Sequence, residues 1–114
     1  MSDCLFCSIV DGKIKANLVY QDDAVLAFKD IAPKAPVHIL IIPRKHIVSV
    51  LDIGANDGDV IGQIFKVSGR LAREQGIAES GFRVVVNSGA DAGQSVLHLH
   101  YHLLGGRQMT WPPG

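Results

Sequence analysis

The stretch SVLHLHYHLLGGRQ, residues 95–108, decides the architecture expected for this chain. It places His98, His100 and His102 two residues apart, with an apolar or aromatic residue in each gap. Alternate side chains of a strand point to opposite faces, so the three histidines should share one face. The other face, expected to pack on a helix, carries Leu97, Leu99, Tyr101 and Leu103. A solvent-facing strand rarely uses three imidazoles, because each ring brings two nitrogens that need partners.

Short apolar runs separated by turn residues indicate further strands and two helices. A short helix is expected over residues 5–12, and a long helix should begin at a cap formed by Asn56 or Asp57 and end at Gly76. Strands are expected in segments 17–30 (two strands joined at Gln21, Asp22 and Asp23), 37–43, 81–89 and 96–106. The predicted fold class is therefore α+β, with a five-stranded antiparallel sheet.

Length and composition limit the classes of function. A chain of 114 residues, 47% hydrophobic, is typical of one well-packed domain. Lys+Arg and Asp+Glu both number 11, so the basic excess of a nucleic-acid-binding protein is missing, whereas a small phosphorylated ligand needs only a local site. No signal peptide or membrane-spanning run of ~20 apolar residues is visible. With only two cysteines, a cytoplasmic protein without membrane partners is expected.

The histidine strand has three possible uses: a metal site, chemistry on phosphorus, or a polar surface. Histidines two residues apart on one strand can share a zinc ion, and a neutral imidazole can also attack phosphorus. The preceding loop NSGADAGQS, residues 87–95, offers glycine amides and a serine hydroxyl that could cradle phosphate oxygens. Because a metal site has no need of such a loop, the combination favours phosphorus chemistry.

The sequence HLHYHLL, residues 98–104, resembles the signature of the histidine-triad superfamily of nucleotide hydrolases and transferases. Three segments resemble the histidine-triad nucleotide-binding protein branch: LFCSIVDGKIKA (5–16), DIAPKAPVHILIIPRKHI (30–47) and NSGADAGQSVLHLHYHLLGGRQMTWPPG (87–114). The diadenosine polyphosphate hydrolase branch lacks the GGRQMTWPPG ending, so it matches less well. The resemblance implies a single histidine-triad domain over residues 1–114.

The resemblance also implies roles for four residues of the active site. His100 would attack the α-phosphorus of a purine nucleoside phosphoramidate and become transiently nucleotidylated. His102 would stabilise phosphate oxygens or pass a proton to the leaving amine. Ser95 would contact the same phosphate or leaving group, and His38 would hold the ring of the nucleophile through its other nitrogen. No cofactor is required for this chemistry.

The nucleoside contacts follow from the same resemblance. Asp30 would accept hydrogen bonds from both ribose hydroxyls, which suits a carboxylate facing a vicinal diol. The purine would lie between the apolar side chains of Phe6, Ile9, Phe28 and Ile31. The contacts on the ribose and phosphate side would be Asn87, Gly93 and Gln94. The expected ligands are AMP, GMP and their phosphoramidates.

Cys4 and Cys7 form a C-x-x-C pair, which is half of a structural zinc site. The resemblance to bacterial-type members of the family that carry such cysteines implies that His46 and His98 would be the other two zinc ligands. The alternative is a pair of free thiols, with His98 hydrogen-bonded to a backbone carbonyl. If these four residues do bind zinc, the ion would be structural and outside the catalytic step.

The prediction is a purine nucleoside phosphoramidase that works through a covalent nucleotidyl-histidine intermediate. The family resemblance further implies a two-fold homodimer that joins two sheets into one. Three alternatives stay open at this point: a non-catalytic purine-nucleotide-binding or scaffold protein, a dinucleoside polyphosphate hydrolase, and a zinc hydrolase.

Overall fold

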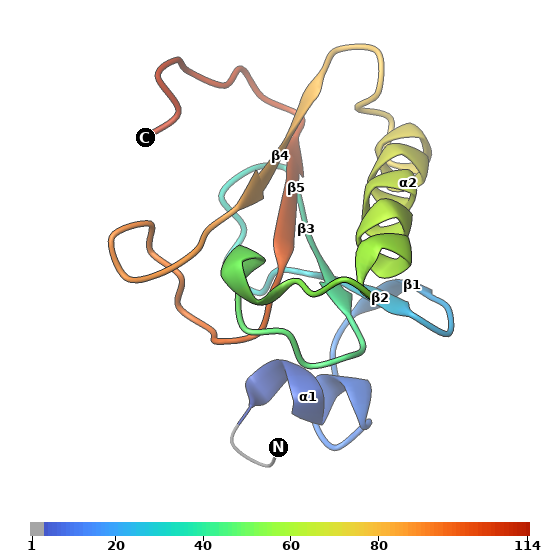
Figure 1. Ribbon diagram of the computed structural model, residues 1–114. Helices are drawn as coiled ribbons and strands as arrows, with labels where there is room; N and C mark the ends of the chain where they lie inside the picture. Colours follow the sequence, from blue (N-terminus) through green and yellow to red (C-terminus); the bar gives the residue numbers. More distant parts are fainter. Residues whose placement is uncertain (1–3) are drawn as a thin grey trace.

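A five-stranded antiparallel sheet forms the centre of the computed structural model, which describes residues 4–114 (Figure 1). Its strands lie in the order β1-β2-β3-β5-β4, so the sheet is a meander of three strands to which β5 and then β4 are added. The strands are β1 (Leu18–Gln21), β2 (Val25–Lys29), β3 (Val37–Pro43), β4 (Phe82–Val86) and β5 (Tyr101–Gly105). The predicted fold class and the central position of the 37–43 strand are confirmed.

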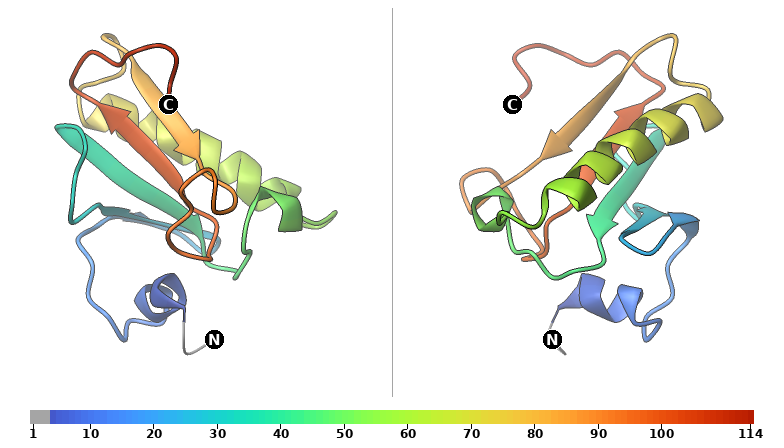
Figure 2. Two further views of the ribbon diagram at one scale, coloured as in Figure 1. Left: turned by 90° about the vertical axis from the view of Figure 1, so that its left-hand side faces the viewer. Right: turned by 45° about the vertical axis from the view of Figure 1, so that its right-hand side comes forward.

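The two helices pack on different faces of this sheet (Figure 2). α2 (Gly58–Glu74) buries Ile64, Val67 and Leu71 against one face, and α1 (Leu5–Val10) packs Phe6 on the other. A single 3-10 turn, η1 (Val50–Asp52), precedes α2. No helix within residues 4–114 is both long and apolar enough to cross a membrane.

The alternation of side chains along β2 and β3 explains why both faces are covered. Val25 and Ala27 face α2, whereas Leu26 and Phe28 face α1. β3 repeats this pattern next to β2, with Leu40 opposite Phe28 across the antiparallel ladder. Strands that are apolar on both faces need a cover on each side, and the two helices provide it.

Two expectations about element ends need correction. Asp57 is the N-cap residue of α2, but its side chain makes no capping hydrogen bond. The carboxylate instead accepts hydrogen bonds from Lys45 Nζ at 2.7 Å and from the Gly54 amide at 2.7 Å. β5 begins only at Tyr101, because the chain bends at residues 96–98. Leu97 therefore leaves the strand alternation and is 63% exposed, instead of packing on α2.

Candidate functional site

A cavity of about 380 Å³ opens between α1, β2, β3 and the start of β5. Its wall includes most of the residues predicted to bind the nucleotide: Phe6, Ile9, Phe28, Asp30, Ile31, Ser95, His100 and His102. Ile31 lies at the rim, where its side chain is fully exposed. The cavity thus combines an apolar wall with a carboxylate, a hydroxyl and two imidazoles.

Aromatic side chains from both sides of the cavity meet at its inner wall. Phe6 of α1 packs edge-on against Phe28 of β2, with ring centroids 5.5 Å apart. It also packs edge-on against His100, at 5.1 Å. Both phenylalanines are buried, so their ring positions are set by the packing of α1 on the sheet.

The ring of His100 is held by the backbone. Its Nδ1 lies 2.7 Å from the carbonyl oxygen of His98, and only a protonated nitrogen can donate to that acceptor. In the neutral ring the lone pair is therefore on Nε2. An imidazole in this tautomer, lining a cavity, is available as a nucleophile. The expected contact from His38 to this ring is wrong, because the His98 carbonyl takes its place.

His38 contacts His102 instead. The Lys34 amide donates to His38 Nδ1 at 3.0 Å, so the neutral His38 ring carries its proton on Nε2. That nitrogen lies 2.9 Å from His102 Nδ1 and 3.4 Å from a carboxylate oxygen of Asp30. His102 Nδ1 consequently accepts, and its own proton is on Nε2. Within residues 4–114 this buried Nε2 has no hydrogen-bond partner.

Burial is the main cause of the lowered pKa values of His38 and His102. It lowers the pKa of His102 to about 4, with further lowering from His100 and His38 nearby. Burial also lowers the pKa of His38, against the opposing effect of Asp30. Asp30, His38 and His102 lie close enough to share a cation, but the proton on His38 Nε2 blocks the nitrogen that would ligate it. The arrangement suits proton transfer better than metal binding.

The loop before β5 presents fewer residues to the cavity than predicted. Ser95 lines it, whereas Asn87, Gly93 and Gln94 do not. The Gln94 side chain is engaged within the loop region: its oxygen accepts from the Gly89 amide, and its nitrogen donates to the carbonyls of Val48 and Val96. Gln94 therefore shapes the loop that carries Ser95.

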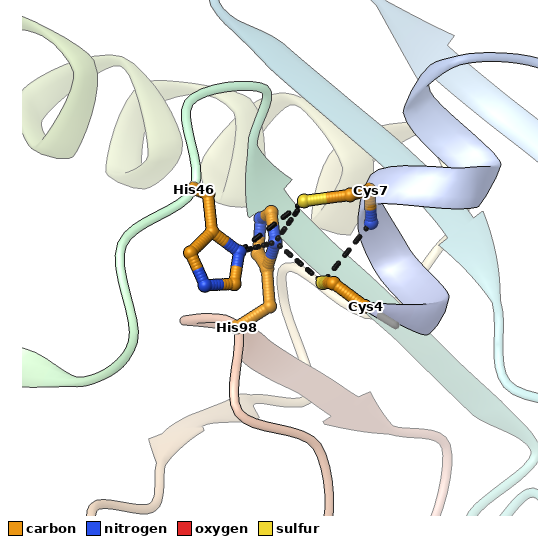
Figure 3. Close-up of side chains that lie close together, drawn as sticks. All are labelled: Cys4, Cys7, His46 and His98. Carbon is orange, nitrogen blue, oxygen red and sulfur yellow. Dashed lines mark hydrogen bonds between the residues drawn. The ribbon is translucent and has the colours of Figure 1, made fainter. Parts of the chain in front are cut away.

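A second cluster lies beside the cavity, where α1 meets the segments around residues 46 and 98 (Figure 3). The Nδ1 atom of His98 lies 3.3 Å from Cys4 Sγ, 3.5 Å from Cys7 Sγ and 3.2 Å from His46 Nδ1. Cys7 Sγ lies 3.2 Å from His46 Nδ1. In a tetrahedral zinc site with these ligands, neighbouring sulfur and nitrogen atoms are about 3.3–3.6 Å apart. The four predicted residues therefore fit a structural zinc ion.

The orientation of the His98 ring agrees with this assignment. Its Nε2 donates to the Pro43 carbonyl at 2.9 Å, which leaves the lone pair on the Nδ1 that faces the sulfurs. The hydrogen bond from His98 to a backbone carbonyl, which was expected for the zinc-free alternative, is therefore present. It uses Nε2, so it leaves Nδ1 free to bind zinc as well. His98 is fully buried and turned toward the cluster, apart from the chemistry expected of His100 and His102.

Comparisons with known proteins agree with the fold and the cluster. A family model described as the HIT domain matches residues 11–109. A 14 kDa zinc-binding protein of Brassica juncea is 44% identical over 114 residues, covering 98% of this chain and 100% of that protein. The structure of a HIT family hydrolase from Legionella pneumophila has a TM-score of 0.96 and 49% identity, covering 98% and 100%. A histidine triad nucleotide-binding protein from Candida albicans has a TM-score of 0.84 and 30% identity, covering 96% and 83%.

Proposed function

This chain belongs to the HIT domain family, and on that premise we propose that it is a hydrolase of purine nucleoside 5′-phosphoramidates. One observation carries the proposal. The backbone holds His100 in the tautomer with a free Nε2, in the wall of a cavity that is also lined by His102, whose Nε2–H has no hydrogen-bond partner among residues 4–114. The Legionella relative, described as a HIT family hydrolase, supports the reaction class.

The cavity offers a separate surface to each part of a nucleotide such as AMP or GMP. The purine would lie along the apolar wall that Phe6 and Phe28 form, with Ile31 at the rim. Asp30 has one carboxylate oxygen bound to the Ala32 amide, and lone pairs on both oxygens are left for the ribose hydroxyls. The Candida structure, described as a histidine triad nucleotide-binding protein, supports this ligand class.

The reaction would proceed in two displacements at phosphorus. His100 Nε2 attacks the α-phosphorus; the Nε2–P bond forms as the bond to the amine breaks. In the neutral pair, His38 and His102 each carry one proton, and the bound phosphoryl anion favours the uptake of one further proton from solvent by this pair. The Nε2 proton of His102 passes to the departing nitrogen, so the amine leaves neutral. Water then attacks phosphorus, releases the nucleoside monophosphate from His100, and returns a proton to His102.

Trapping the covalent intermediate tests this function. Wild-type protein is mixed briefly with an adenosine phosphoramidate, quenched without acid and mapped by mass spectrometry; an AMP adduct is expected on His100. The His100→Ala variant should bind AMP but lack both adduct and turnover. A variant that keeps wild-type turnover would refute the covalent mechanism. If wild-type protein binds AMP without adduct or turnover, it is a nucleotide-binding protein instead.

Two further properties belong to this proposal. The zinc ion held by Cys4, Cys7, His46 and His98 would cross-link α1 to the sheet, and no step of the reaction uses it. β4 is the edge strand on the side away from β1, so pairing of β4 with the β4 of a second copy would extend the sheet across a two-fold homodimer. We place the protein in the cytoplasm, where cysteines are available to bind metal.

A further inference from the structure

We propose that the metal-loaded cluster of Cys4, Cys7, His46 and His98 sets the nucleotide affinity of the neighbouring cavity, because it docks α1 as the cavity wall. The inference rests on the proposed function only for the nature of the ligand, a purine nucleotide. It makes His98 a positioning residue that serves two sites, since its ring belongs to the cluster and its carbonyl holds His100.

The first step concerns what attaches α1 to the rest of the protein. Its backbone hydrogen bonds are local, joining residues 4–9 to residues 8–14. Within the described chain, hydrogen bonds from α1 and its cap to distant residues come only from the sulfurs of Cys4 and Cys7. A helix of six residues is too short to be stable alone, so α1 depends on these contacts and on apolar packing.

The second step connects α1 to the cavity. Leu5, Phe6 and Ile9 all line it, and Phe6 lies between the two cysteines in sequence. Phe6 is only 4% exposed and packs edge-on against His100. If α1 moves away from the sheet, the cavity loses this wall and the ring of His100 loses a neighbour.

The third step connects the cluster to the nucleophile through His98. The Nδ1 of its ring faces the sulfurs, and its carbonyl oxygen accepts from His100 Nδ1 at 2.7 Å. Two contacts independent of metal also hold this segment: His98 Nε2 to the Pro43 carbonyl, and the Leu99 amide to the Ile47 carbonyl. Metal loss should therefore loosen α1 more than it displaces His98.

Cys4→Ser separates the metal from the helix cap. Cys4 Sγ accepts from the Cys7 amide at 3.2 Å, and serine is a preferred residue for this N-cap role. Serine is a poor zinc ligand, so the variant should keep the helix start and lose the ion. Leu71→Ala in α2 is the matched control, because it weakens the core on the far face of the sheet and leaves the cluster intact.

The experiment measures AMP binding by calorimetry and amide exchange of α1 for zinc-loaded wild-type protein, chelator-treated wild-type protein, Cys4→Ser and Leu71→Ala. Elemental analysis reports zinc, and circular dichroism confirms that each sample is folded. If α1 is docked for about a tenth of the time without metal, the AMP dissociation constant rises about tenfold. Exchange of the α1 amides should accelerate in the same two zinc-free samples and stay protected in Leu71→Ala.

Equal AMP affinity and equal α1 protection in folded proteins with and without zinc would overturn the inference. A loss of affinity as large in Leu71→Ala as in Cys4→Ser would also overturn it, because general destabilisation would then explain the effect. Failure of the proposed function gives a different result: zinc-loaded protein would not bind AMP, or would bind it without forming an adduct. In both cases, α1 exchange still reports whether the metal docks the helix.

Discussion

Lowering the pH from 7 to 4.5 should destabilise the protein, and His102 should account for a large part of the loss. The pKa of this ring falls from an ordinary 6.5 to about 4 in the folded protein, mainly through burial. Between these values the unfolded chain binds the proton and the folded protein does not. The free energy of unfolding therefore falls as the pH falls from 6.5 toward 4, and is unaffected by this group above 6.5.

The size of the effect follows from the shift. At ~1.4 kcal/mol per pKa unit, the full difference is worth about 3.5 kcal/mol, and discounting for partial solvent exposure of the ring leaves about 1–2 kcal/mol. Urea unfolding at pH 7 and pH 4.5 measures it, in chelator at both values so that metal release does not contribute. Circular dichroism is the suitable signal, because the single tryptophan, Trp111, is 81% exposed.

His102→Gln supplies the comparison that isolates this ring. Other groups that titrate between pH 7 and 4.5 are present in both proteins, so their contributions cancel when the two losses are subtracted. The variant should lose about 1–2 kcal/mol less stability than the wild type over this range. Equal losses in the two proteins would refute the assignment of His102 as a buried, neutral ring.

Gly105→Ala should lower the stability measured by thermal unfolding by about 1–3 kcal/mol, because an added Cβ would lie 3.0 Å from the Cβ of Ile77. A second substitution, Ile77→Ala, should restore part of this loss, and an unchanged Tm in Gly105→Ala would contradict the packing. Asp22→Ala should cost about 1–3 kcal/mol in urea unfolding, and Tyr20→Phe less, since the carboxylate joins two turn amides as well as the Tyr20 hydroxyl. His38→Leu should slow amine release about 100-fold in rapid-quench assays while AMP affinity stays near wild type; equal loss of both would point to a damaged pocket.

Much of the fold could be predicted from local patterns. The apolar run 37–43 predicted β3 with its observed bounds, and the β-branched and aromatic residues in segment 17–30 predicted β1 and β2, although the turn follows Gln21 instead of including it. The helical period after residue 56 predicted α2. The start of β5 could not be predicted in this way, because an alternating sequence continues through Leu97 and His98 while the backbone bends there. Only the tertiary contacts of His98 show why the chain turns before the strand begins.

The site was predictable as a set of residues but less so as a set of contacts. His38 lies beside Leu40, which pairs with His102 across the ladder between β3 and β5. The side chains of His38 and His102 therefore lie on the same face of the sheet, on neighbouring strands and two residues apart in register. His100 lies before β5 begins. Which histidine His38 meets depends on this register, and register is set by packing over the whole sheet. Likewise, only the folded chain brings His46 and His98 to the visible C-x-x-C pair.

The contacts around the cavity join the beginning of the described chain to its last fifth. Cys4 and His98 are separated by 94 positions, and Cys7 and His98 by 91. Closing so long a loop carries a large entropic cost unless the intervening sheet has already formed. Docking of α1 is therefore expected as a late event during folding, so a partly synthesised chain would have neither the Cys–His cluster nor the α1 wall of the cavity.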